Sequence, residues 1–301
     1  MQQPLPRLAS VLGLCAICLG ATSESCTFFG IGRDESDLTI DLAAEAPADP
    51  AILQVVVPLA GLEFRRDDDA VETLTFTDTE PVDLLALTGT NAPLRLFTEE
   101  SLSEGTYTGV RLLFDEDDID SGFVTDAFGR EFGLRIAQGD YAPFDFTVAE
   151  GERDEAWTLT LDLRRALVFD DDRDEFELRP ALRSVLTEDS RDILGSVTAV
   201  CVGGRTLETG AVYLFENRNV RPDDYDGLDP EPFATTPLDS DPIAGTFTYA
   251  LRFLPEGRYT IALTCRGDED LVDEDDELRF QNVRNIEIDL DDEGSLVHDI
   301  G

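Results

Sequence analysis

Acidic side chains are the residues of this sequence best suited to chemistry, and several of them occur in runs. Ca²⁺ is bound by about six to eight oxygen ligands, mainly carboxylates and carbonyls. The run DDDRDE lies between two apolar, strand-like segments, so its carboxylates could converge on a cation. Its acidic members are the candidate metal ligands Asp170, Asp171, Asp172, Asp174 and Glu175. Arg173 inside the run favours the alternative of a solvated hairpin loop whose charge is neutralised internally.

Two further acidic runs, 115–120 and 268–277, are also candidates. None of the three runs has the alternating Asp pattern and distal Glu of a helix-loop-helix calcium loop, and the run 170–175 is preferred because it is short and lies between two predicted strands. Four arginines flank the first run, at positions 164, 165, 179 and 183. We expect them to pair with acidic side chains or to cover apolar surface with their stems.

Side chains for most forms of catalysis are missing from the sequence. The single histidine, His298, is three residues from the C-terminus, where a catalytic group is poorly positioned. All 23 basic residues are Arg, so chemistry that needs a Lys amine or a phosphate loop ending in Lys is excluded. We therefore expect a protein that is not an enzyme and that has no cofactor, Ca²⁺ excepted.

Five cysteines are present, and their positions indicate different roles. Cys201 and Cys265 each lie in an apolar, strand-like run, so in an oxidising compartment they are predicted to form a disulfide; two buried free thiols are the alternative. Cys26 follows an apolar segment, the place where a lipoprotein carries its acylated cysteine. Ser23-Glu24-Ser25 is a poor lipobox, so cleavage by the ordinary signal peptidase near residues 20–21 competes with lipidation.

The N-terminus resembles an export signal. A basic residue, Arg7, precedes the fourteen uncharged residues 8–21, which are too few to span a bilayer as a helix. We assign residues 1–25 to a signal peptide and 26–36 to a linker. The expected location is the periplasm or the outer membrane of a bacterium, or its cell surface, with membrane attachment only through a lipid anchor.

Apolar and polar residues alternate in most of the remaining chain, with Gly, Pro, Asp and Asn between the alternating stretches. Residues 38–42, 71–77, 106–114, 157–163, 246–253 and 258–265 show the pattern. Strands at such regular intervals predict an all-β fold with two β-sandwich-like domains in tandem, at 37–190 and 194–301. The phrase L-x-E-G-x-Y-T occurs at 102–108 and again at 254–260, and it predicts a tight turn leading into a strand whose Tyr packs at a sandwich end.

The net charge of −42 limits the partners of the protein. Such a surface repels phosphate groups, so nucleic acid is excluded as a partner. A halophilic or marine source explains the charge, because salt screens the repulsion; cation binding at acidic loops is the alternative.

Four phrases resemble a family of exported bacterial proteins, many of them lipoproteins, known as domain of unknown function 4382. They are VDLLALTG (82–89), LSEGTYTGVRLL (102–113), LTLDLRRALV (159–168) and LRPALRSV (178–185), within residues 36–190. The second half resembles small sandwiches of the prealbumin or carboxypeptidase-regulatory type, chiefly through residues 254–265. The resemblance implies a β-rich fold and an envelope location, and it implies no activity.

These observations together predict a non-catalytic cell-envelope protein, an interaction, adhesive or structural β-sandwich module with an unknown envelope or extracellular partner. The alternative is an envelope module that binds Ca²⁺ or a small ligand.

Overall fold

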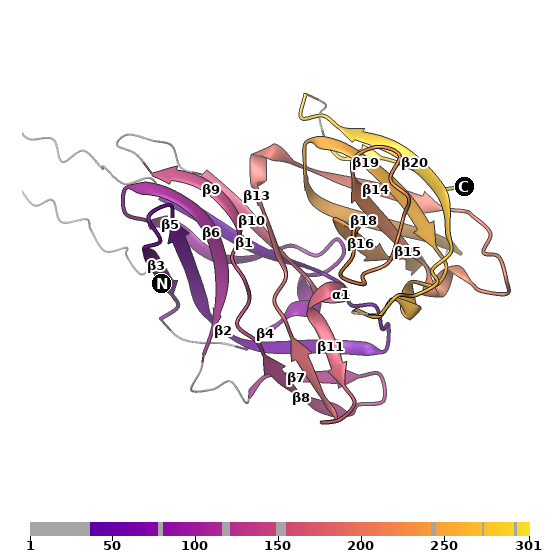
Figure 1. Cartoon of the computed structure of the whole chain (residues 1–301), viewed down its shortest axis with the longest axis horizontal. Helices are drawn as coiled ribbons and strands as arrows, with labels where there is room; N and C mark the ends of the chain where they lie inside the picture. Colours follow the sequence, from indigo (N-terminus) through magenta and orange to yellow (C-terminus); the bar gives the residue numbers. More distant parts are fainter. Residues whose placement is uncertain are drawn as a thin grey trace, which may run out of the picture. The chain divides into compact units, whose positions relative to one another are not determined.

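Strands form nearly all of the regular structure in the computed structural model (Figure 1). It describes residues 37–77, 81–115, 121–148, 155–241, 245–272, 274–291 and 294–301, within one compact unit that spans 34–301. The all-β prediction is confirmed. The predicted signal peptide, the linker and Cys26 lie outside the described residues, as does most of the acidic run 115–120.

The first sheet has the order β13 (Leu182–Leu186), β10 (Glu155–Asp162), β1 (Asp37–Glu45), β5 (Leu94–Ser101). β1 and β10 run parallel, and Ile40 lies opposite Trp157 in their register. Alternate residues of both strands, such as Leu38 and Leu159, are fully buried in a common apolar core. The period-two pattern of the sequence therefore places one face of this sheet against that core.

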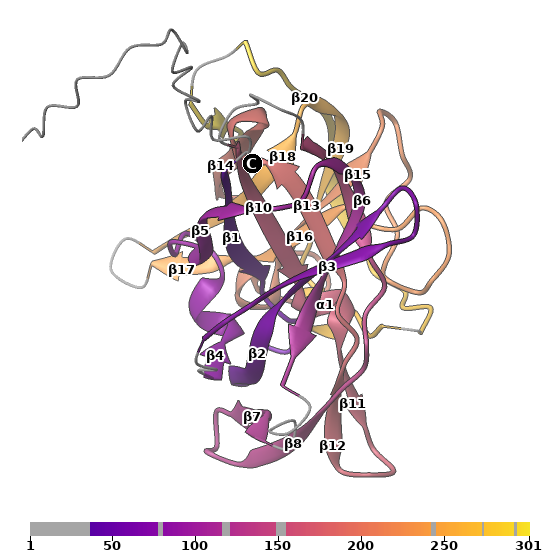
Figure 2. The same ribbon diagram turned by 90° about the vertical axis from the view of Figure 1, so that its left-hand side faces the viewer.

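The second sheet is built around the long strand β2 (Ile52–Arg66) and has nine strands. Its path is β11 (Leu167–Asp170), β12 (Glu175–Leu178), β8 (Glu131–Ile136), β7 (Phe123–Asp126), β2, β6 (Gly105–Phe114) and β9 (Ala142–Val148), while β3 (Val71–Thr75) and β4 (Pro81–Asp83) also pair with β2. Figure 2 shows β7, β8, β11 and β12 gathered at one end. Gly61 marks a register shift in β2; a Cβ there would lie 2.1 Å from Leu74 O, so only glycine fits.

The second half contains two sheets of four strands each. One has the order β17 (Asp239–Asp241), β18 (Thr246–Pro255), β14 (Ser190–Val197), β21 (Leu296–Val297); the other has β16 (Ala234–Pro237), β15 (Ala211–Glu216), β19 (Gly257–Thr264), β20 (Phe280–Ile288). A second apolar core contains buried residues of both sheets, among them Ile193 and Ile261. Cys201 and Cys265 form the predicted disulfide, with Cα atoms 5.9 Å apart.

Both faces of the first sheet are covered. In β10, Thr158, Thr160 and Asp162 alternate with the apolar core residues, yet each is at most 8% exposed. The second half covers this other face, where β1 packs near β16 and β13 near β18. Ala43, Val185 and Phe253 form a small apolar cluster between the halves. Polar side chains such as Asp162 and Arg183 also lie at this contact, and their hydrogen bonds join the two halves.

Candidate functional site

A buried arginine connects the two halves of the chain. Arg164 lies in the short helix α1 (Leu163–Ala166), whose N-terminus is capped by Asp162. The Arg164 side chain is 1% exposed and that of Asp270 is fully buried, with 3.4 Å between Nη1 and Oδ2. Nη1 also donates to the hydroxyl of Tyr213 at 3.0 Å and to the carbonyl of Gly267. The hydrogen bonds that Nη1 donates therefore all go to groups of the second half that lie more than 45 residues away in sequence.

Two buried tyrosines complete this network. The Tyr213 hydroxyl donates to Asp270, and the Tyr225 hydroxyl donates to Asp162 at 2.6 Å. The backbone N–H of Tyr225 donates to Asp270 Oδ1 at 3.1 Å. Burial raises the pKa of both tyrosines well above the ordinary value, so both remain neutral hydrogen-bond donors.

A second buried ion pair joins β1 and β13 to the second half. Arg183 Nη2 donates to Glu45 Oε1 at 2.7 Å, and the two side chains are 12% and 10% exposed. Arg183 also donates to the carbonyl of Phe233 at 3.1 Å, and the backbone N–H of Thr235 donates to Glu45 Oε2 at 3.1 Å. Burial raises the pKa of Glu45 to about 7, although the Arg183 charge opposes the effect.

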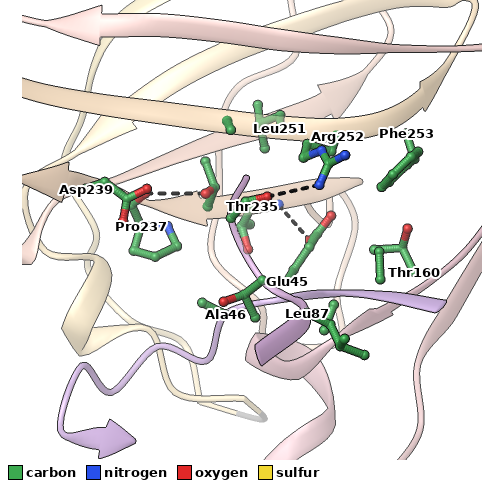
Figure 3. A pocket seen from close by; sticks show the side chains of 16 residues that line it. Glu45, Ala46, Leu87, Thr160, Thr235, Pro237, Asp239, Leu251, Arg252 and Phe253 are labelled. Carbon is green, nitrogen blue, oxygen red and sulfur yellow. Dashed lines mark hydrogen bonds between the residues drawn. The ribbon is translucent and has the colours of Figure 1, made fainter. Parts of the chain in front are cut away.

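A pocket of about 110 Å³ lies beside Glu45, and residues of both halves line it (Figure 3). Arg252 closes one side by donating to the carbonyl of Asn91 at 2.6 Å. The Glu45 carboxylate points toward the backbone N–H of Thr235 inside the pocket, along the hydrogen bond already described. Pockets for drug-sized ligands measure roughly 300–1,000 Å³, so this one has room for ordered water or an ion rather than for such a ligand.

The predicted metal ligands of the run 170–175 lie in the turn of the β11–β12 hairpin. Asp170 accepts a hydrogen bond from Arg173 at 2.8 Å, and Arg135 lies 3.4 Å from Glu175. Burial opposes a lower pKa for Asp170, but the hydrogen bonds and charge of Arg173 together with the backbone N–H of Asp172 outweigh it, and the pKa is lowered. Asp171, Asp172 and Asp174 are exposed. In the part of the chain that the structure describes, the groups of acidic side chains that converge lie elsewhere.

The sequence predicted ion pairs for the flanking arginines but not their partners. Arg164 and Arg183 pair with Asp270 and Glu45, Arg179 with Glu177 at 3.0 Å, and Arg165 with Glu231 at 3.4 Å. Sequence reasoning missed Glu45, Asp162 and the buried tyrosines. The sequence did contain a signal for these buried acids. Acidic residues such as Asp41 and Glu45 occur within the otherwise apolar strand β1.

Paired β-sheets in each half, joined through a buried ion pair and buried hydrogen bonds, define an all-β protein of sandwich-like units. The profile described as domain of unknown function (DUF4382) matches residues 36–180, so this part of the chain is a domain of that description. Among curated proteins, no sequence matches the chain. No helix within the described ranges is long and apolar enough to cross a bilayer.

Two solved structures show faint similarity to the chain. The fimbrial anchor protein Mfa2 of Porphyromonas gingivalis is 9% identical with a TM-score of 0.19, over 78% of this chain and 80% of that one. A putative cell adhesion protein of Bacteroides fragilis is 9% identical with a TM-score of 0.19, over 88% and 91% of the two chains. Similarity at this level carries no argument about function.

Proposed function

We propose that this chain is a non-catalytic protein of the bacterial cell envelope, an interaction or structural module made of β-sandwich units. The observation that carries the proposal is two buried ion pairs at the contact between the halves. Arg164–Asp270 crosses the contact, while Glu45–Arg183 lies within the first half and bonds to backbone groups of Phe233 and Thr235 in the second. A buried ion pair is stable only in one geometry, because each charge that loses its partner remains desolvated. Such contacts favour a fixed arrangement of the two halves, as a scaffold requires, over a hinge that opens and closes.

The disulfide and the N-terminal sequence support a location in the cell envelope. A disulfide between Cys201 and Cys265 is stable in an oxidising space such as the periplasm and rare in the cytosol. The apolar leader at 8–21 provides a route of export, and Cys26 provides a site for a lipid anchor.

An apolar groove at the end of the nine-stranded sheet supports a role in binding a partner. Phe128, Phe169 and Leu271 are 82%, 39% and 51% exposed and line this groove of about 520 Å³. Exposed apolar side chains gathered in one place are typical of protein–protein contact sites. Asp49 and Asp171 lie at the rim, so a partner with a basic rim and an apolar centre fits best.

Expression of the full chain in a Gram-negative host, followed by fractionation, tests the location. We expect the protein in the membrane fraction with Cys201 and Cys265 blocked to thiol reagents, and Cys26→Ala in the soluble periplasmic fraction. A cytosolic product with its leader intact and both thiols reactive would disprove the envelope assignment.

Binding of Cys26→Ala protein to isolated envelopes tests the interaction. We expect Phe128→Ser with Leu271→Ser to lose retention, and Val200→Ser to retain it as a control, since Val200 is 83% exposed but is not a groove residue. Equal retention of all three proteins would remove the groove from the proposal.

A further inference from the structure

Two loops of the second half bring five aspartates together. One is the segment 217–233 between β15 and β16, and the other is the segment 265–279 between β19 and β20. One carboxylate oxygen from each of Asp224, Asp270 and Asp276 lies within 4.8 Å of the other two. Asp224, Asp226 and Asp275 form a second such group. Asp224 is common to both groups and therefore lies at their centre.

Backbone N–H groups hold these carboxylates in place. Asp276 N donates to Asp224 Oδ2, so the two loops are tied directly to each other. Leu271 N donates to Asp276 Oδ2 at 2.7 Å, and Tyr225 N donates to Asp270 Oδ1 at 3.1 Å. Each bond fixes one oxygen of a carboxylate, which makes the group a preformed arrangement rather than a set of mobile surface acids.

An unpartnered oxygen at the centre points to a ligand. Asp224 is 0% exposed, and its Oδ1 is buried without a hydrogen-bond partner. Leaving a buried acceptor unpaired is costly, and more so for a charged group, so native proteins satisfy nearly all of them.

Arg164, the cation next to the cluster, already has partners of its own. Arg164 is 3.4 Å from Asp270 and also bonds to Tyr213 and Gly267, so its charge is shared among these three groups. Asp226 is half-buried and Asp275 is exposed, so the cluster is open to solvent at these two residues. An ion could enter there and keep water molecules as its remaining ligands.

We propose that Asp224, Asp270 and Asp276 bind a Ca²⁺ ion, with Asp226 and Asp275 as further ligands from the solvent side. The donors are carboxylates without His or thiolate, the chemistry that suits a hard cation. Ca²⁺ accepts several carboxylates in irregular geometry, whereas Mg²⁺ requires near-octahedral geometry and retains more of its water. Because Asp270 also pairs with Arg164, the bound ion orders both loops next to the contact between the halves.

Calorimetric titration of the purified, metal-stripped protein in a NaCl background tests the site. We expect one saturable Ca²⁺ event and a thermal midpoint that rises with Ca²⁺ concentration, with a weaker response to equal Mg²⁺. Asp224→Asn should weaken Ca²⁺ binding at least about tenfold, since ligand charge sets affinity. The metal-free variant should unfold at the same temperature as metal-free wild type or higher, because a buried charge is removed.

Asp172→Asn is the matched control, since it removes the same charge from the exposed turn of the β11–β12 hairpin, is not a groove residue, and should leave Ca²⁺ binding unchanged. Wild-type binding retained by Asp224→Asn, or a midpoint that follows ionic strength alone, overturns the proposal. Tb³⁺ gives a second readout on wild-type protein, because it emits when a nearby aromatic ring is excited. Emission through Tyr213 and Tyr225 that Ca²⁺ displaces supports the site, and its absence overturns it even if the variant does not fold.

Discussion

Tyr107 and Tyr259 make the same hydrogen bond in two different sheets. The hydroxyl of each donates to the carbonyl of the residue four positions earlier, Ser103 at 2.8 Å and Pro255 at 2.9 Å. In both copies of the repeated phrase L-x-E-G-x-Y-T, the Tyr therefore makes a hydrogen bond back to the turn that precedes its strand. The glycine serves differently in the two copies: Gly105 has φ +149°, whereas a Cβ on Gly257 would lie 3.0 Å from the Tyr259 hydroxyl.

Removal of these hydroxyls should destabilise the protein while the rings stay packed. Tyr259→Phe should cost about 1 kcal/mol, the net value of one hydrogen bond. Tyr107→Phe should cost more, about 1.5–3 kcal/mol, because its hydroxyl also contacts the Glu72 carboxylate at 2.6 Å. Urea unfolding measures the stability of both variants. Equal midpoints for the variants and wild type would show that the repeated hydrogen bond does not stabilise the fold.

The buried Glu45 should make stability depend on pH. Its pKa is about 7 in the folded protein against 4.5 ordinarily, so the folded state holds a proton that the unfolded state has lost between these values. The contribution of Glu45 to stability is therefore highest below pH 4.5, falls as the pH rises through this window, and stays low above pH 7. Besides Arg183, which stabilises the ionised form, Asp162 faces Glu45 and favours the protonated form.

Thermal midpoints of wild type and Glu45→Gln between pH 4.5 and pH 7.5 should diverge, with the wild type losing about 1–3 kcal/mol more as the pH rises. Only the slope with pH is diagnostic, because the substitution also removes the charge partner of Arg183. Glu104→Gln, on an exposed turn, is the control and should parallel wild type. Parallel curves for Glu45→Gln as well would contradict the raised pKa.

Arg164→Met should be among the most destabilising substitutions in the chain. It leaves Asp270 buried without its cation, which typically costs about 3–5 kcal/mol. Arg165→Met is the natural control: Arg165 is the next residue, its side chain is 54% exposed, and its pairing with Glu231 should contribute less than about 1 kcal/mol. Measurements in EDTA keep any cation at Asp270 out of the comparison.

A double variant distinguishes loss of the ion pair from loss of packing. Adding Asp270→Asn to Arg164→Met should recover part of the lost stability, because no unpaired buried charge remains. If the double variant is as unstable as the sum of the two single ones, the pair is not coupled and the interface depends on other contacts.

The strands were predictable because their patterns are local. The alternation at 38–42 becomes β1, with Leu38, Ile40 and Leu42 on one buried face. The covered second face of that sheet was not predictable, because Asp41 and Asp162 have the polarity of solvent-facing positions and only the second half buries them.

The acidic clusters also could not be predicted from local sequence alone. The run 268–277 was a candidate from composition, but its partner Asp224 lies 46 residues before Asp270 and approaches it only because β15 pairs with β19. The run 170–175 had the denser sequence and a hairpin context, yet Arg173 and Arg135 pair with its acids. Closely spaced acidic residues in the sequence therefore pointed to a metal site in the hairpin at 170–175. The aspartates that do converge are brought together by strand pairing between distant parts of the chain.

The disulfide should contribute strongly to the stability of the second half. It closes a loop of 64 residues, for which the chain-entropy treatment gives about 4 kcal/mol of stabilisation as an upper value. We expect Cys201→Ala with Cys265→Ala to lower the free energy of unfolding by about 2–4 kcal/mol, with the m-value in urea showing whether the unfolded state has expanded. Reduction of wild type with a small thiol should produce a similar loss, while the double variant should not respond to the thiol. A wild-type midpoint unchanged by full reduction would mean that the sheets around β15 and β19 are stable without the cross-link.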